Sequence, residues 1–247
     1  MWLMTARRFG SARCPRLGRL SCGAVVAAVL LAGCGTVRVA PATREGAHEP
    51  PATLPAKPGV WLSLFDGRTL EGWKPLEEGP FEGHGEVHVE NGTIVLERGR
   101  MQTGISWTGG FPRDRYEVSL EAKRTQGSDF FCGMTFPVGD SPCTLIVGGW
   151  GGSIVGLSNV DDQAAVENQT TGTYNFDNDI WYRIRLRVSD AKIEAWINGE
   201  QVIDLGRAGH RFSVWYEQEA ARPFGISTWD TGAALREIRV RRLSSSE

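Results

Sequence analysis

A glycine-rich segment around one tryptophan is the first part of the sequence whose residue types suit ligand binding. Four glycines flank Trp150 between residues 148 and 152. Glycine lets the backbone approach a ligand closely, and an indole offers a flat face on which a ring can stack. Trp150 is therefore a candidate substrate-binding residue. The alternative is a tight connection around a core tryptophan.

Residues 159–168 hold a run of acids and amides that could take part in acid–base chemistry. The run comprises Asn159, Asp161, Asp162, Glu167 and Asn168. Glu167 is the candidate catalytic base, since a carboxylate accepts a proton, and the two asparagines are candidate substrate-binding groups. Asp161 and Asp162 are weak metal candidates, because carboxylates suit a hard cation but their spacing matches no cation-binding loop. The alternative for all five is a solvated loop.

Two cysteines, Cys132 and Cys143, lie on either side of a turn-forming segment at residues 137–142. If the flanking segments form a hairpin, the two thiols could face each other and form a disulfide in an oxidising compartment. The alternative is a pair of buried thiols that pack as small apolar groups. Neither cysteine has another cysteine or a histidine at zinc-ligand spacing, so a zinc site is not expected.

The elements that must position these groups are predicted to be β-strands. Between residues 182 and 188, apolar side chains alternate with arginines, a period that is typical of a half-buried strand. Asn91-Gly92 and Asn198-Gly199 each predict a tight hairpin turn. Further strands are expected at residues 61–65, 86–90, 93–97, 105–107, 115–124, 129–136, 144–147, 153–157, 191–197, 201–205, 224–229 and 236–243. About a dozen short strands predict one all-β domain over residues 59–243, a two-sheet antiparallel sandwich, with residues 244–247 as a tail.

The first 33 residues have the pattern of an export signal. They contain five arginines and no acid, and an apolar run ends them. The run finishes in Leu31-Ala32-Gly33-Cys34, which resembles a bacterial lipobox, so we expect cleavage before Cys34 and lipidation of its thiol. Prolines mark residues 34–58 as a disordered tether. These features predict a lipid-anchored protein of the bacterial cell envelope that faces the periplasm or outer membrane. The alternative is an ordinary secretory signal.

Charge and composition exclude several classes of function. The chain carries 27 basic and 29 acidic residues, and without residues 1–33 the balance becomes 22 against 29. A domain with no basic excess does not suit nucleic acid. The sequence has no G-x-S-x-G or G-x-x-x-x-G-K pattern, which disfavours esterase and nucleotide-binding functions. High counts of glycine (31) and tryptophan (nine) favour an aromatic-lined β-protein that binds a neutral hydroxylated ligand.

Several segments resemble one known family. Residues 64–73, which read LFDGRTLEGW, look like the opening motif L-F-(N/D)-G-x-x-L-x-G-W of the 3-keto-disaccharide hydrolase domain family. Residues 89–94, 116–121 and 193–199 are similar to later hairpins and strands of the family, and residues 235–240 to its closing motif. The resemblance covers residues 59–243.

This resemblance implies a concanavalin A-like jelly-roll sandwich that acts on 3-keto-glycosides. A ketone at C3 of a sugar acidifies the proton on C2, so a base can remove that proton and the leaving group on C1 departs. Addition of water then completes a hydrolysis. The protein must supply a base, and either hydrogen-bond donors or a divalent metal ion at the enolate oxygen.

The resemblance also implies site residues. Asp129 stands where the family places a polar site residue, so it is a candidate catalytic base or substrate ligand. Trp229 and Asp230 take the place of a His-Gly pair in relatives and are candidate substrate-binding residues. Thr144 stands where many relatives have a glutamate.

Three hypotheses follow from these observations. The first is an envelope lipoprotein that cleaves 3-keto-glycosides. The second is a non-catalytic carbohydrate-binding module on the same sandwich, favoured by the changed family positions while Trp150 and Trp229 persist. The third is a structural envelope lipoprotein. The fold does not decide between them, but convergence of Asp129, Glu167 and Asp230 beside the two tryptophans would favour the enzyme.

Overall fold

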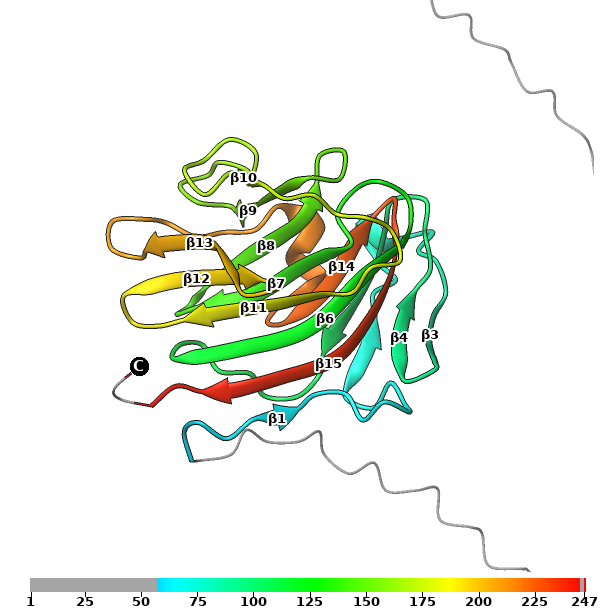
Figure 1. Ribbon diagram of the computed structural model, residues 1–247, viewed down its shortest axis with the longest axis horizontal. Helices are drawn as coiled ribbons and strands as arrows, with labels where there is room; N and C mark the ends of the chain where they lie inside the picture. The colour runs from blue at the N-terminus through cyan, green and yellow to red at the C-terminus, as the bar shows by residue number, and fades with distance from the viewer. Residues whose placement is uncertain (1–56, 245–246) are drawn as a thin grey trace, which may run out of the picture. The chain divides into compact units, whose positions relative to one another are not determined.

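The computed structural model describes residues 57–244 and Glu247. The predicted signal peptide at residues 1–33, the predicted lipidation site Cys34 and most of the predicted tether lie outside the described residues. Inside them, no helix is long and apolar enough to cross a membrane. The described chain folds into two antiparallel β-sheets with short 3-10 helices (Figure 1).

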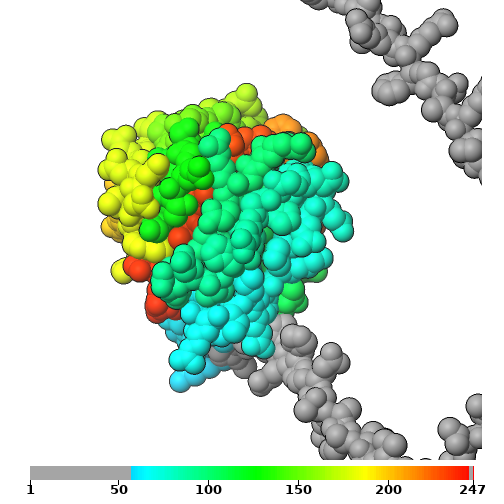
Figure 2. All heavy atoms as spheres, turned by 90° about the vertical axis from the view of Figure 1, so that its right-hand side faces the viewer, coloured from blue at the N-terminus to red at the C-terminus, as the bar shows by residue number. Residues whose placement is uncertain are grey.

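The larger sheet contains eight strands of the described chain, and β1 (Leu62–Ser63) pairs with its strand β15. The strands follow one another across the sheet in the order β13 (Glu200–Gly206), β12 (Lys192–Ile197), β11 (Tyr182–Val188), β6 (Tyr116–Gln126), β15 (Gly232–Arg242), β4 (Thr93–Leu96) and β3 (Val87–Glu90). Seen from the side, red atoms of the C-terminal strand β15 lie between green and blue-green atoms (Figure 2), as its pairing with β6 and β4 requires.

The second sheet contains seven strands of the described chain. Their order is β10 (Gly172–Thr173), β9 (Ile154–Ser158), β8 (Ser141–Gly149), β7 (Cys132–Val138), β14 (Gly225–Trp229), β5 (Gln102–Trp107) and β2 (Trp73–Pro75). Two 3-10 helices accompany the sheets, η1 (Gly79–Phe81) and η2 (Tyr216–Ala221). Contacts with β5 and β14 place η2 beside the second sheet.

Alternating side chains build the core between the two sheets. Strand β11 buries every second residue, and its arginines point away from the core. The inward residues of both sheets, such as Leu120 of β6 and Leu145 of β8, are fully buried in one cluster. Burial of apolar surface is the main favourable term in folding, so this period of two in the sequence places one face of each strand in the core.

The predicted two-sheet antiparallel sandwich is confirmed, and most predicted strands agree with the structure within a few residues. Both Asn-Gly hairpins are present, with positive φ angles at Asn91, Gly92, Asn198 and Gly199, as a type I′ turn requires. Strands β2 and β10 and both 3-10 helices were not predicted from the sequence. These elements are too short to show a hydrophobic period.

The predicted disulfide between Cys132 and Cys143 is wrong, because both thiols are free and buried. Strands β7 and β8 do form the expected hairpin, but their register places Cys132 opposite Val147 and Cys143 opposite Phe136. The two cysteines are thus offset by four residues along the ladder, or roughly 13 Å at the usual rise per residue. A disulfide needs Cα atoms within about 7 Å.

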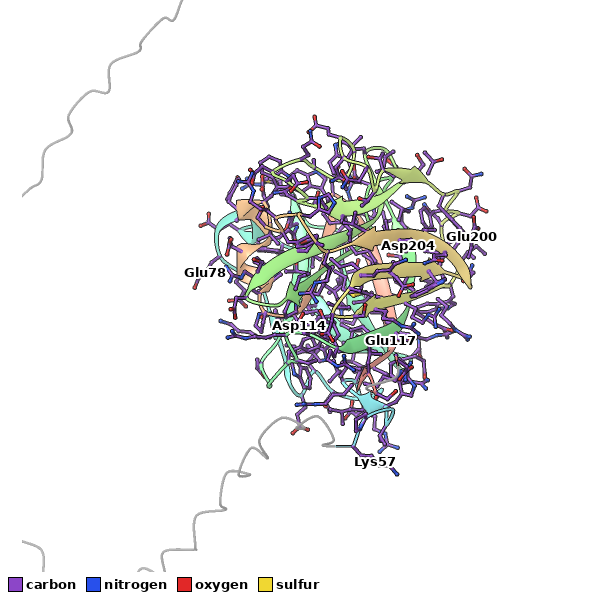
Figure 3. The ribbon with its side chains drawn as sticks, turned by 90° about the vertical axis from the view of Figure 1, so that its left-hand side faces the viewer. Lys57, Glu78, Asp114, Glu117, Glu200 and Asp204 are labelled. Carbon is purple, nitrogen blue, oxygen red and sulfur yellow. The ribbon has the colours of Figure 1, made fainter. Side chains whose placement is uncertain are left out.

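The outer face of the larger sheet carries a network of ion pairs. Glu117 of β6 is 2% exposed at its side chain and accepts hydrogen bonds from Arg185, Arg187 and Arg241. Figure 3 labels Glu117 on β6 and Asp204 on the edge strand β13. Glu117 is therefore a buried acid under three guanidinium groups, whereas Asp204 forms an exposed pair with Lys192.

Candidate functional site

A pocket of about 440 Å³ opens on the outer face of the seven-stranded sheet. Its lining combines aromatic, amide and acidic side chains from several elements and loops. The lining residues are Gln102, Asp129, Phe130, Ile146, Trp150, Ser158, Trp215, Glu217, Gln218 and Trp229. Its size lies in the range of small-ligand sites in proteins, and it brings together three of the predicted residues, Asp129, Trp150 and Trp229.

The floor of the pocket comes from outward-facing positions of adjacent strands. Trp229 of β14 pairs with Gln102 of β5, and Ser158 of β9 pairs with Thr144 of β8. A side chain at Gly133 of β7 would meet the Phe130 ring at 2.9 Å. The absence of a side chain there lets Phe130 lie over the sheet against Trp229, with their ring centroids 6.3 Å apart.

Asp129 lines the pocket and also fastens the glycine-rich loop that carries Trp150. Its Oδ1 accepts hydrogen bonds from the backbone N–H groups of Phe130 at 2.7 Å and Trp150 at 3.2 Å, and its Oδ2 accepts one from Gly151 at 3.3 Å. Trp150 has a positive φ of 48° and a residue exposure of 46%. The carboxylate therefore positions the indole at the pocket, and its position fits a supporting role better than that of a free base.

Helix η2 brings three lining residues that the sequence analysis did not identify. Trp215 precedes the helix and is 47% exposed, Glu217 is half-buried, and Gln218 is buried. The Glu217 carboxylate forms no hydrogen bond or ion pair with any other described residue. The only sequence signal was two adjacent aromatics followed by an acid at residues 215–217, which has no period that would mark an element.

A network of buried polar side chains lies beneath the pocket. Gln218 accepts a hydrogen bond from Ser227 at 2.9 Å and donates one to Gln102 at 3.3 Å. Thr135 reaches Gln218 at 3.4 Å and also contacts Thr144 at 2.9 Å. The Nε2 of Gln102, 1% exposed, has no hydrogen-bond partner within the described part of the chain. An unsatisfied buried donor is costly, so it marks a point where a ligand or water is needed.

Three other predicted site residues lie outside the pocket lining. Glu167, the predicted base, is exposed on the loop after β9. Asn168 is buried as a loop brace: its Nδ2 donates to three backbone carbonyls, those of Leu157, Gln163 and Ala164, at 2.8–3.0 Å. Asn159 is 4% exposed and donates to Ser213 at 3.4 Å. Asn168 therefore stabilises the loop, and Glu167 is exposed outside the pocket lining.

The two weak metal candidates are engaged by other side chains of the described chain instead. Asp161 accepts hydrogen bonds from the His210 ring at 2.7 Å and from the Arg211 backbone N–H at 2.9 Å, and these two donors hold its pKa below the ordinary value. Asp162 forms an ion pair with Arg211. Across residues 57–244, no group of three or more histidine, cysteine or acidic side chains is placed to hold a metal ion.

Asp230, the last predicted binding residue, follows Trp229 but does not line the pocket. Its carboxylate accepts a hydrogen bond from Arg98 at 2.8 Å. The predicted convergence is thus partial, because Asp129 joins the tryptophans while Glu167 and Asp230 do not.

Comparison with known proteins identifies the family. A model of the 3-keto-alpha-glucoside-1,2-lyase-like domain matches residues 60–241. The chain belongs to this family. No protein with a curated description matches it.

Several solved structures are similar to this chain at low sequence identity. Domain 4 of AbnA, an extracellular arabinanase from Geobacillus stearothermophilus solved with arabinotriose, is 14% identical with a TM-score of 0.50, over 77% of this chain and 95% of that one. The carbohydrate-binding module CBM66 from Bacillus subtilis is 13% identical with a TM-score of 0.46, over 69% and 95%. A laminarinase from Flavobacterium is 13% identical with a TM-score of 0.49, over 75% and 100%.

Three of the four positions that the family resemblance singled out lie at or below the pocket. Trp229 and Asp129 line it, and Thr144 is buried in the polar network below it. The family resemblance and the cavity therefore point to the same face of the seven-stranded sheet.

Proposed function

We propose that this pocket binds the sugar ring of a 3-keto-glycoside and cleaves its glycosidic bond by elimination. The observation that carries the proposal is the lining itself. Two groups that have no hydrogen-bond partner among the described residues, the Glu217 carboxylate and the buried Gln102 Nε2, belong to residues that line one tryptophan-rich cavity of a chain from this family.

The residues present suit each step of such a reaction. Indole faces of Trp150, Trp215 and Trp229 stack against the sugar ring. Glu217 takes the C2 proton, the electron pair of that C–H bond moves into the ring as the C3 ketone becomes an enolate, and Gln102 donates a hydrogen bond to the enolate oxygen. The C1–O bond then breaks, and the departing alkoxide takes a proton from water. The hydroxide that this water becomes adds to C1 of the resulting enone, and C2 takes back the proton held by Glu217, which completes the hydrolysis and restores the base.

The test is cleavage of 3-keto-methyl-glucoside by the purified protein and by two variants. Glu217→Gln removes the base and should lower the rate by roughly 100-fold or more. Glu219→Gln is the matched control, because Glu219 lies on the same helix but pairs with Arg222 outside the pocket. A wild-type rate in Glu217→Gln would overturn the assignment of the base. A parallel reaction with EDTA tests for a metal ion.

One observation favours a second candidate function, a non-catalytic saccharide-binding module. Asp129 is engaged by three backbone N–H groups, so the pocket has one unpartnered carboxylate rather than an acid and a base. This candidate predicts no cleavage above the buffer rate together with saturable quenching of tryptophan fluorescence by the same sugar.

We also propose that the domain acts at the bacterial cell envelope, anchored by lipid on Cys34. The proposal rests on the signal-like pattern of residues 1–33 and the lipobox-like sequence that ends at Cys34.

A further inference from the structure

The charge of the pocket lining is of one sign. Its two ionisable residues, Asp129 and Glu217, are both acids, and no lysine, arginine or histidine lines it. The hydrogen bonds to Asp129 come from neutral backbone N–H groups, so they leave its negative charge without a counter-ion. Glu217 has no ion pair in the described residues. An anionic ligand would be repelled here, and a cationic ligand attracted.

The tryptophans of the pocket differ from those on the opposite sheet. On the outer face of the larger sheet, Arg185 lies 3.7 Å from the ring centroid of Trp196, and Arg236 lies 4.0 Å from that of Trp181. Among the described residues, no lysine or arginine lies over the rings of the three pocket tryptophans. Their faces remain available, and Trp150 and Trp215 are each nearly half exposed.

Aromatic faces combined with carboxylates form a recognition site for an ammonium group. The ring quadrupole attracts a cation, and the attraction grows when water is excluded. A carboxylate adds a charge-assisted hydrogen bond to the ammonium N–H groups. In this pocket, Glu217 lies in η2 and Trp215 directly precedes that helix. Trp150 lies on the glycine-rich loop whose backbone donates hydrogen bonds to Asp129. Aromatic rings and carboxylates therefore line the same cavity.

We propose that the saccharide bound in this pocket carries a free amine, which sits against the indole faces and is attracted by the negative charge of Glu217. The inference rests on the proposed function in one respect, that the pocket is a sugar site. It adds the ligand class: amine-bearing sugars bind more tightly than neutral ones, and uronic acids bind most weakly.

The experiment compares three β-1,4-linked disaccharides that differ in charge: the glucosamine disaccharide of chitosan, cellobiose and cellobiuronic acid. Dissociation constants for the full protein are measured by calorimetry and by tryptophan fluorescence, at a pH where the amine is protonated. We expect the diamine to bind about ten-fold more tightly than cellobiose, since one charged hydrogen bond or cation–π contact contributes about 1.4 kcal/mol. Cellobiuronic acid should bind more weakly than cellobiose.

Two variants separate the pocket from the general negative charge of the domain. Glu217→Gln should reduce the preference for the amine to about two-fold or less while cellobiose still binds. Glu219→Gln removes the same charge outside the pocket and should keep the preference. High salt should weaken diamine binding and leave cellobiose binding nearly unchanged.

The outcomes distinguish this inference from the proposed function. Equal affinity for the diamine and cellobiose, or a preference that survives in Glu217→Gln, would overturn the inference and leave the sugar site intact. Saturable binding of the diamine without cleavage of any 3-keto-glycoside would support the inference and contradict the lyase assignment. No saturable binding of any of the three disaccharides would overturn the inference, and cleavage of 3-keto-methyl-glucoside tests the proposed function separately.

Discussion

At the scale of single residues, the carboxylate of Asp129 connects the pocket to the glycine-rich loop that carries Trp150. In the wild-type chain, the Gly151 N–H donates a hydrogen bond to the Oδ2 of Asp129. The substitution Asp129→Asn keeps one acceptor oxygen but places an amide NH₂ group, which cannot accept that hydrogen bond, opposite the Gly151 N–H. We expect Asp129→Asn to lower the free energy of unfolding by about 1–2 kcal/mol and to weaken saccharide binding several-fold. Urea unfolding and fluorescence titration measure the two effects.

The matched control is Asp140→Asn, because the Asp140 side chain is 92% exposed and pairs with Arg113 at the surface. It should leave both stability and binding almost unchanged. If Asp129→Asn instead kept wild-type stability and affinity but lost cleavage, Asp129 would be the catalytic base and the supporting role would be incorrect.

The two free thiols give a prediction for pH dependence. Burial raises the pKa of Cys132 to about 12 and also raises that of Cys143. In the unfolded chain, both thiols ionise near their ordinary pKa of 9.0. The native state therefore holds more protons than the unfolded state above that pH, and stability falls as pH rises.

Above pH 9.0, we expect each buried thiol to lower the free energy of unfolding by roughly 1 kcal/mol for each unit of pH increase. Urea unfolding at successive pH values measures the slope, and Cys132→Ala should reduce it. A slope equal in wild type and in Cys132→Ala would contradict the prediction. A thiol reagent should also label both cysteines only after denaturation.

At the scale of elements, the strand pair β6–β11 depends on one buried acid. Glu117→Ala would leave Arg185, Arg187 and Arg241 without their shared carboxylate in a partly buried setting. Removing one partner of a buried charge cluster costs about 3–5 kcal/mol, so we expect a loss near the lower limit because Arg185 is partly exposed. Chemical denaturation measures it.

Asp204→Ala serves as the comparison on the same sheet. Within the described part of the chain, Asp204 pairs only with exposed Lys192, and exposed pairs contribute about 0–1 kcal/mol. A similar loss for Asp204→Ala and Glu117→Ala would show that the three arginines do not depend on Glu117. The alternation of arginines in the sequence predicted an outward face for β11, but it could not show that an acid of β6 lies beneath them.

At the scale of the whole molecule, the N-terminal pattern predicts a covalent anchor. Labelled palmitate should be incorporated into the wild-type protein expressed in a bacterial host, because the lipobox-like sequence ends at Cys34. Cys34→Ser should abolish the label, and Cys22→Ser, a change inside the predicted signal, should retain it. Label that persists in Cys34→Ser would contradict the lipoprotein proposal.

The sequence by itself determined the sandwich, because strand formation follows from local patterns. The alternation at residues 182–188 and the two Asn-Gly turns needed no distant partner to be recognised. It also identified Asp129, Trp150 and Trp229, since glycines around an indole and the family motifs mark positions along the chain.

Only the tertiary structure decided which polar groups share the pocket. The hairpin register separates Cys132 from Cys143, and loop packing leaves Glu167 exposed while it buries Asn168 as a brace. Helix η2 brings Glu217 to the pocket from a segment with no periodic signal. Periodicity reports which face of a strand is buried, whereas a site depends on contacts between segments far apart in sequence, and those contacts are fixed by packing.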